Sequence, residues 1–174
     1  MQVELSNIQK KFEEATRKLE EKINVLDGGG PFMWKIDYGE LIRKAFMLEQ
    51  TDLYSPEFYR YGYKFKLNAN PNAYGDGKNT HLSIFMIIMK GENDSSLTWP
   101  FNKKVTFTVI DQQEDENARE NIVVCFNADP SLRCFARPKG SQNEGWGHHD
   151  FYELRKRRYI VDDTIFIQVQ IASP

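Results

Sequence analysis

The 174-residue sequence lacks the features that mark disulfide-rich, zinc-finger and membrane-spanning proteins. It contains only 2 Cys residues, too few for a disulfide framework, and neither lies in a zinc-finger spacing. No apolar run reaches the roughly 18 residues that a membrane-spanning helix needs. The polar N-terminal residues also lack the apolar core of a signal peptide. We therefore expect a cytoplasmic protein with reduced thiols and no metal site.

A surplus of positive charge is also lacking. The 23 Lys and Arg residues are balanced by 25 Asp and Glu residues, for a formal net charge of −2. Nucleic-acid-binding domains are strongly basic, so this balance argues against nucleic acid as a partner. Apolar residues are plentiful, because they make up 40% of the chain and include 12 Phe. That content excludes a wholly disordered chain, and the length fits one domain with a short accessory segment.

The N-terminal segment has a helical pattern. Residues 1–26 contain neither Gly nor Pro, and their apolar side chains recur at heptad spacing. The seam consists of Leu5, Ile8, Phe12, Ala15, Leu19 and Leu26. Because the seam is narrow and its flanks are charged, we predict a coiled-coil helix over residues 1–27, covered by other copies of the chain. The alternative is an amphipathic helix folded back on its own domain. Because the seam mixes Leu, Ile, Phe and Ala, the sequence does not indicate whether the coiled coil is a dimer or a trimer.

A Gly-rich joint at residues 28–31 separates this helix from the rest of the chain. In residues 32–174 the apolar period changes to 2, which is typical of strands. The predicted strands are 32–36, 41–47, 59–67, 81–90, 103–111, 121–126 and 164–171. Residues 150–157 are the only helix predicted in this part. Seven or more short strands separated by turn residues predict an all-β fold, an antiparallel β-sandwich.

This second part carries short motifs in a fixed order. They are Trp34-Lys35-Ile36, Ser55-Pro56-Glu57-Phe58-Tyr59, Tyr61-Gly62-Tyr63-Lys64, Gly75-Asp76-Gly77, Thr80-His81-Leu82-Ser83, Trp99-Pro100-Phe101, Asp111-Gln112, Phe135-Ala136-Arg137-Pro138 and Asp162-Asp163-Thr164-Ile165-Phe166-Ile167. Together with the preceding helix, they resemble the C-terminal TRAF domain of the tumour-necrosis-factor-receptor-associated factors, a branch of the MATH superfamily. The resemblance extends from about residue 31 to about residue 172.

The resemblance implies an eight-stranded antiparallel β-sandwich of the TRAF-C/MATH type, preceded by a coiled coil that forms a parallel homotrimer. It implies a cytoplasmic signalling adaptor with no catalytic activity and no cofactor. Its partners would be peptides from the cytosolic tails of TNF-receptor-like or Toll/interleukin-type receptors, or of their adaptors. Such a peptide adds to a sheet edge, and three sites on one trimer bind clustered receptors by avidity. In the family, RING and zinc fingers that support ubiquitin-ligase activity lie upstream, and their zinc spacings are absent from this chain.

The resemblance also implies a peptide-binding groove. Its residues are Asn68, Asn70, Tyr74, Phe85, Phe126, Leu132, Arg133, Cys134, Gly145, Trp146, Gly147 and His148. Asn68 and Asn70 stand where peptide-binding members have Arg and Tyr, and Tyr74 stands where many have Asp. Residues 132–134 replace consecutive serines. Because Asn carries no charge for an acidic ligand residue, we expect a groove with altered specificity.

Two alternative functions remain open from the sequence. One is a MATH substrate-recognition module of a ubiquitin-pathway enzyme, against which the coiled coil argues. The other is a scaffold that binds phosphoinositide membranes through a basic run. The basic run consists of Arg155, Lys156, Arg157 and Arg158. A zinc or nucleophile site built from His148, His149 and Asp150 with a Cys has no recognised spacing and is disfavoured.

Overall fold

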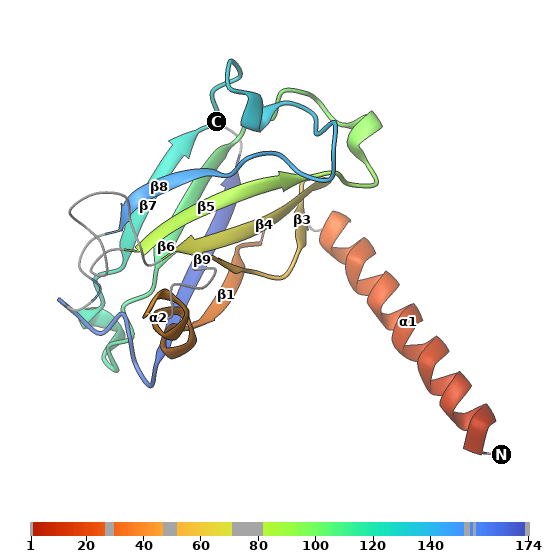
Figure 1. The fold of residues 1–174 in the computed structure, drawn as a ribbon, viewed down its shortest axis with the longest axis horizontal. Coiled ribbons are helices and arrows are strands. Elements are labelled where there is room, and N and C mark those ends of the chain that lie inside the picture. Colours follow the sequence, from red (N-terminus) through yellow and green to blue (C-terminus); the bar gives the residue numbers. More distant parts are fainter. Residues whose placement is uncertain are drawn as a thin grey trace.

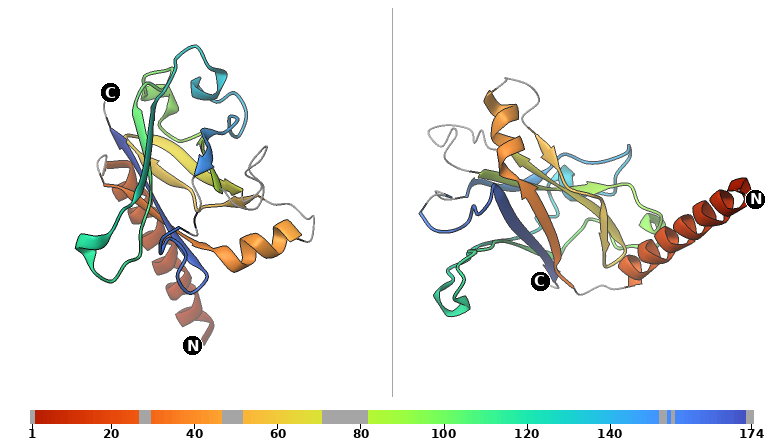
Figure 2. Two further views of the ribbon diagram at one scale, coloured as in Figure 1. Left: turned by 90° about the vertical axis from the view of Figure 1, so that its left-hand side faces the viewer. Right: turned by 90° about the horizontal axis from the view of Figure 1, so that it is seen from below.

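The computed structural model describes residues 2–26, 30–46, 52–70, 82–151, 154 and 156–172. A long helix, α1 (Gln2–Leu26), projects from a β-sandwich and approaches it near strand β3 (Phe58–Arg60) (Figure 1). The two further views show the same separation of a rod-like helix from a two-layered body (Figure 2). The described part of the chain contains no helix that is both long enough and apolar enough to cross a membrane.

Two antiparallel sheets form the sandwich. The first has the order β1-β9-β6-β7, from the strands β1 (Phe32–Asp37), β9 (Thr164–Ala172), β6 (Lys104–Val109) and β7 (Ile122–Asn127). The second has the order β2-β4-β5-β8, from the strands β2 (Leu53–Tyr54), β4 (Tyr63–Asn70), β5 (Leu82–Met89) and β8 (Trp146–Phe151), with β3 also paired to β4. The predicted all-β antiparallel sandwich is confirmed.

The short strands β2 and β3 act as one interrupted edge strand. Both pair with β4 on the side away from β5, and the register shifts by one residue between Tyr54↔Asn68 and Phe58↔Phe65. At the interruption, the Ser55 amide donates to the Leu67 carbonyl, and the Ser55 hydroxyl accepts from the Leu67 amide at 2.8 Å. Counted in this way, the described strands number eight, as the resemblance implied.

One predicted strand is a helix. Residues 41–47 were expected to be extended, but the chain forms the helix α2 (Tyr38–Phe46). The Asp37 carboxylate accepts a hydrogen bond from the Glu40 amide at 2.9 Å and so caps the first turn. Leu41 is fully buried on the inner side of α2. The capping residues were the sequence signal that the strand prediction overlooked.

A second predicted strand is a hairpin. Residues 59–67 were expected to form one strand, but β3 ends at Arg60 and β4 begins at Tyr63. Between them, Tyr61 and Gly62 both have positive φ angles, 53° and 86°, as a two-residue turn of type I′ requires. The backbone therefore reverses within a segment whose apolar alternation suggested continuity.

The predicted helix over residues 150–157 is also wrong. Its first two residues belong to β8, and the described residues 154 and 156–159 form turns. Residues 152, 153 and 155 lie outside the described residues. Strand β8 pairs with the first part of β5, from Leu82↔Phe151 to Met86↔Trp146. These sheet partners outweigh the local helical pattern, because strand formation satisfies the backbone of both strands.

The core lies between the sheets and is rich in aromatic rings. Strand β6 alternates buried and half-buried residues along its length, so one face packs inward. Phe101 and Phe65 are fully buried with ring centroids 5.5 Å apart, and Tyr63 packs edge-on against both Phe101 and Trp99 at 5.1 Å. The Trp99 indole donates to the Asp94 carbonyl at 2.8 Å, so its polar end is satisfied.

Candidate functional site

The apolar seam of α1 is exposed to solvent. Val3, Leu5, Ile8, Phe12 and Leu19 are all at least 60% exposed. Ala15 is exposed too, whereas the side chain of Leu26 lies outside the described residues. The helix extends away from the sandwich (Figures 1 and 2), so in this structure the seam is not folded back on its own domain. An exposed apolar seam that runs from Leu5 to Leu19 on a projecting helix, before Lys22 interrupts it, is a surface suited to pairing with other helices.

The outer face of the second sheet carries the candidate binding surface. Strand register places four residues in one row across the sheet, namely Tyr54, Asn68, Phe85 and Gly147. Residues directly opposite each other on antiparallel strands share a face, so their side chains point to the same side. Phe85 is half-buried in the middle of this row. The row ends at β8, which is the edge strand of its sheet.

Two adjoining cavities lie over this row. The first, of about 570 Å³, is lined by Asp52, Tyr54, Asn68, Asn70, Phe85, Ile87, Gln142, Asn143, Glu144 and Gly145. The second, of about 380 Å³, is lined by Phe85, Leu132, Arg133, Cys134, Glu144, Gly145, Trp146 and Gly147. Because Phe85, Glu144 and Gly145 belong to both, the cavities form one shallow depression. We name this depression the Phe85 groove.

Two glycines keep the groove open beside Phe85. A Cβ atom on Gly147 would lie 1.9 Å from the Ile84 carbonyl oxygen, so no side chain fits there. A Cβ atom on Gly145 would lie 3.0 Å from the Phe85 Cβ. The β8 backbone can therefore approach β5 closely only with Gly at residue 147.

The groove wall opposite β8 is a short 3₁₀ turn, η3 (Arg133–Phe135). Phe135 is buried, and its ring centroid lies 6.1 Å from that of Trp146 and 6.1 Å from that of Phe126. Trp146 is 41% exposed, so it presents one side to the groove and contacts Phe135 with the other. Phe126 lies on β7 of the first sheet and supports Phe135 from behind.

Most of the predicted groove residues come together in the structure. Those that line the Phe85 groove are Asn68, Asn70, Phe85, Leu132, Arg133, Cys134, Gly145, Trp146 and Gly147. Phe126 and His148 line neither cavity, and His148 pairs with the fully buried Ile84. Tyr74 lies outside the described residues.

Six lining residues were not predicted from the sequence. They are Asp52, Tyr54, Ile87, Gln142, Asn143 and Glu144. Asp52 accepts a hydrogen bond from the Asn70 side-chain amide at 3.0 Å, and this pair is 18 residues apart in the chain. Gln142, Asn143 and Glu144 directly precede the Gly145-Trp146-Gly147 motif, and their position beside it was the one available signal.

The charge in the groove is mixed. Among its lining residues, Arg133 is the one cation, whereas Asp52 and Glu144 carry carboxylates. Lys66 lies at the margin, with its Nζ 4.6 Å from the ring centroid of Tyr54. Burial raises the pKa of the Cys134 thiol, and the charge of Glu144 acts in the same direction. Cys134 is therefore a neutral thiol and a poor nucleophile at neutral pH.

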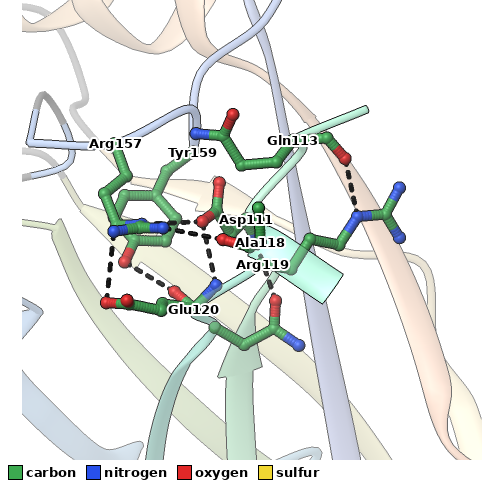
Figure 3. A network of polar contacts seen from close by, with 8 residues as sticks. Asp111, Gln113, Ala118, Arg119, Glu120, Arg157 and Tyr159 are labelled. Carbon is green, nitrogen blue, oxygen red and sulfur yellow. Dashed lines mark hydrogen bonds and ion pairs between the residues drawn. The ribbon is translucent and has the colours of Figure 1, made fainter. Parts of the chain in front are cut away.

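Arg157 of the basic run is engaged in a polar network (Figure 3). Its guanidinium donates to the carboxylate of Asp111 at 2.8 Å and to the Ala118 carbonyl at 2.7 Å, and it lies 3.2 Å from the Glu120 carboxylate. Asp111 is fully buried and also accepts from the Glu120 amide at 2.9 Å. Burial opposes ionisation of Asp111, but the hydrogen bonds from Arg157 and Glu120 prevail and lower its pKa.

Of the other three residues of the basic run, the structure describes only two side chains. Lys156 and Arg158 are exposed, and Arg155 lies outside the described residues. Cys125 is exposed on β7 and Cys134 is half-buried, and both thiols are free. Within the described part of the chain, no three His, Cys, Asp or Glu side chains gather in a geometry that would hold a metal ion.

Comparison with known proteins gives consistent matches. A family model described as TRAF/meprin, MATH domain matches residues 50–168. TNF receptor-associated factor 1 of Mus musculus is 36% identical over 177 residues, which cover 95% of this chain and 42% of that protein. TNF receptor-associated factor 2 of Homo sapiens is 38% identical over 164 residues, covering 88% and 32% respectively. A solved structure of Notothenia coriiceps TRAF5 matches with a TM-score of 0.74 at 26% identity, covering 98% of this chain and 88% of that one.

The extent of these matches bears on the site. The chain spans less than half the length of these two curated relatives. The segment matched by the family model nevertheless contains all the residues that line the Phe85 groove, from Asp52 to Gly147. The groove therefore lies within the segment that the family model matches and not in an unmatched insertion.

Proposed function

The chain belongs to the TRAF/MATH domain family, and from this premise we propose that it is a trimeric signalling adaptor that binds short linear peptides. The peptides would come from cytosolic tails of TNF-receptor-like or Toll/interleukin-type receptors, or from their adaptors, so the protein would act in the cytoplasm. The membership agrees with the resemblance inferred from the sequence motifs. We propose no catalytic activity for this chain, so any ubiquitin-ligase activity would lie in segments outside it.

The Phe85 groove is the observation that carries this proposal. It lies beside β8, an edge strand that pairs with β5 alone among the described strands of its sheet. An extended peptide can add to such an edge through main-chain hydrogen bonds, while alternate side chains enter adjoining cavities. Phe85 and Trp146 supply apolar surface in the cavity that Gly145 and Gly147 also line. The two aromatic rings can bury apolar side chains of the peptide, and the two glycines let the peptide backbone approach β8 closely.

The polar residues of the groove support an altered specificity. Asn68 and Asn70 carry no charge, and the Asn70 amide is already hydrogen-bonded to Asp52. Residues 132–134 offer Leu, Arg and Cys in place of hydroxyl groups. A ligand side chain that is held by serines or by an Arg in other members would lose these partners here. We therefore propose a peptide motif that depends on apolar contacts with Phe85 and Trp146.

The exposed seam of α1 supports a homotrimer. Three copies would bury Leu5, Ile8, Phe12, Ala15 and Leu19 against one another, whereas a single copy leaves them in water. Trimerisation would place three Phe85 grooves on one assembly. The rival function, a MATH substrate-recognition module of a ubiquitin-pathway enzyme, does not require this seam, so the oligomeric state separates the two functions.

The lipid-binding alternative receives less support from the described residues. Arg157 is paired with Asp111 and Glu120, which removes one of the four cations of the basic run from membrane contact. An Arg157→Glu variant would place a carboxylate beside buried Asp111. Such a variant would test folding as much as lipid binding, so Arg158→Glu is the cleaner test of vesicle association.

Peptide-display selection against the 174-residue chain tests the proposed function. We expect one short motif to be enriched, and the Phe85→Ala/Trp146→Ala variant to lose it. The matched control is Met33→Ala/Val123→Ala, which removes two exposed apolar side chains from the first sheet and should retain the motif. Thermal unfolding verifies that both variants fold. Enrichment that persists in the Phe85→Ala/Trp146→Ala variant, or no enrichment at all, would contradict peptide binding in this groove.

A further inference from the structure

A third cavity extends the Phe85 groove beyond η3. It has a volume of about 490 Å³ and is lined by Arg133, Ala136, Arg137, Lys139 and Asn143. Arg133 also lines the groove on one side, and Asn143 lines it on the other. The cavity is therefore continuous with the groove and not a separate surface feature. We name it the basic subsite.

The three cations of the basic subsite have no partners within the described residues. Arg133, Arg137 and Lys139 are all exposed, and none of their side chains takes part in an ion pair or hydrogen bond there. None of the residues that line the cavity carries a carboxylate. Arg157 shows the contrast, because its charge is met by both Asp111 and Glu120. Three unpaired cations around one cavity create a positive potential that favours an anion.

The backbone that carries these cations is firmly anchored. The Asn143 side-chain amide donates to the carbonyls of Cys134 at 3.0 Å and Ala136 at 2.7 Å, and so ties the η3 turn to the segment before β8. Phe135 is buried beneath the turn, and its carbonyl accepts from the Phe101 amide at 2.8 Å. Pro138, between Arg137 and Lys139, is also buried. A fixed backbone lowers the ordering cost of binding.

The charge changes sign along the surface. Asp52 and Glu144 line the groove over Phe85, whereas the basic subsite has cations alone among its charged lining residues. An anionic side chain is repelled in the cavity that Asp52 and Glu144 line and attracted in the basic subsite. The preference of a bound peptide for negative charge must then depend on position along the peptide, and not on its net charge.

We propose that the basic subsite binds a phosphorylated serine or threonine on the flank of the peptide that occupies the Phe85 groove. The proposal rests on the proposed function. A phosphate brings a charge of about −1.5 to −2 and three acceptor oxygens, which suit two guanidinium groups and an ammonium better than one carboxylate does. A glutamate at the same place binds through the same charges, but more weakly. Phosphorylation of a receptor or adaptor tail would thereby strengthen docking.

The first experiment probes the subsite without any peptide. Free O-phospho-L-serine is titrated into the isotope-labelled chain, and the Arg side-chain Nε–H resonances are followed by NMR. We expect saturable shifts for Arg133 and Arg137, and we expect the Arg133 shift to be lost in the Arg137→Gln/Lys139→Gln variant. Lys35→Gln/Arg158→Gln removes the same charge from exposed residues elsewhere and should keep the shifts of Arg133 and Arg137. Absence of saturation, or equal loss in both variants, would overturn the subsite.

The second experiment places the subsite relative to the groove. A peptide selected by display is synthesised with Ser, Glu or phosphoserine at each residue flanking the one that contacts Phe85. We expect phosphoserine on one flank to tighten binding about tenfold or more over Ser, and Glu to tighten it less. The gain should disappear in Arg137→Gln/Lys139→Gln and persist in Lys35→Gln/Arg158→Gln.

The outcomes distinguish this inference from the proposed function. Selected peptides that bind without any gain from phosphoserine would leave the peptide-binding function intact and refute the flanking phosphate site. Phosphoserine shifts in a chain that selects no peptide would refute peptide binding in the groove while the subsite stands. A gain that survives in Arg137→Gln/Lys139→Gln would assign phosphate recognition to other residues and refute the proposal.

Discussion

Single charges in this molecule have distinct roles that depend on what surrounds them. Asp111 is a fully buried carboxylate, and its partner Arg157 comes from a segment 46 residues away in the chain (Figure 3). Tyr159 adds a hydrogen bond from its hydroxyl to the Glu120 carbonyl at 2.8 Å. Together these contacts tie the η2 turn (Glu116–Ala118) and the segment before β9 to the end of β6. The network therefore holds together one end of the sandwich.

We expect Asp111 to make stability depend on acid pH. Because the folded state lowers its pKa, its contribution is present above the unfolded-state value near 3.9 and is lost as pH falls through the folded-state value. Asp111→Asn should reduce the free energy of unfolding at pH 7 by about 1–3 kcal/mol. Below about pH 4, the free energy of unfolding should fall less steeply with pH in the variant than in the original chain. Urea unfolding from pH 2.5 to 7, at one fixed protein concentration, measures both effects. If the free energy of unfolding falls as steeply with acid pH in the variant as in the original chain, this role of Asp111 is contradicted.

At the scale of elements, the strands that could be predicted are those whose pattern is local. The predicted segments 103–111 and 164–171 overlap β6 and β9, because their alternation follows from one buried face. The helix α2 and the strand β8 were missed. Strand β8 depends on pairing with β5, which a local pattern does not contain. Helix α2 was signalled by the Asp37 cap, which apolar alternation does not report.

The edge strand β8 should be sensitive to substitution at Gly147. A Cβ atom there would lie 1.9 Å from the Ile84 carbonyl oxygen, so Gly147→Ala must displace β8 from β5. We expect a loss of about 1–3 kcal/mol in the free energy of unfolding, together with loss of peptide binding. Gly140→Ala is the matched control, since a Cβ atom at residue 140 would meet nothing within 4 Å. Equal thermal unfolding midpoints for the two variants would show that the β8–β5 approach tolerates a side chain.

At the scale of the whole molecule, the projecting helix and the groove are complementary features. The exposed seam of α1 would gain burial in the proposed trimer, and each copy would contribute one Phe85 groove. A shallow groove with few charged contacts is expected to bind one peptide weakly. Several linked grooves bind a cluster of peptides more tightly by about 10²–10⁴-fold without any new contact.

Phe12→Glu should separate assembly from binding at the single groove. Phe12 is 72% exposed in the single chain, so the substitution leaves the sandwich intact but places three carboxylates in the seam of a trimer. We expect a monomer by light scattering, unchanged affinity for soluble peptide, and much weaker binding to a surface dense in peptide. Lys10→Glu, off the seam, should remain trimeric. A trimeric Phe12→Glu variant would contradict the seam, and equal binding to the dense surface would contradict avidity.

The pattern of the sequence by itself determined the N-terminal helix and the all-β sandwich with its antiparallel strands, and the family resemblance of its motifs implied most residues of the Phe85 groove. These features follow from the local period of apolar residues and from motifs in order along the chain, which do not require knowledge of distant contacts. Tertiary structure alone decided that β8 is a strand, that Arg157 is paired with Asp111, and that Arg133, Arg137 and Lys139 surround one cavity. The pairing of β8 and the ion pair of Arg157 depend on backbone partners and charges that folding brings together from distant segments. The cavity depends instead on how one short segment, residues 133–143, is folded. A run of four cations in the sequence does not reveal which of them folding will neutralise.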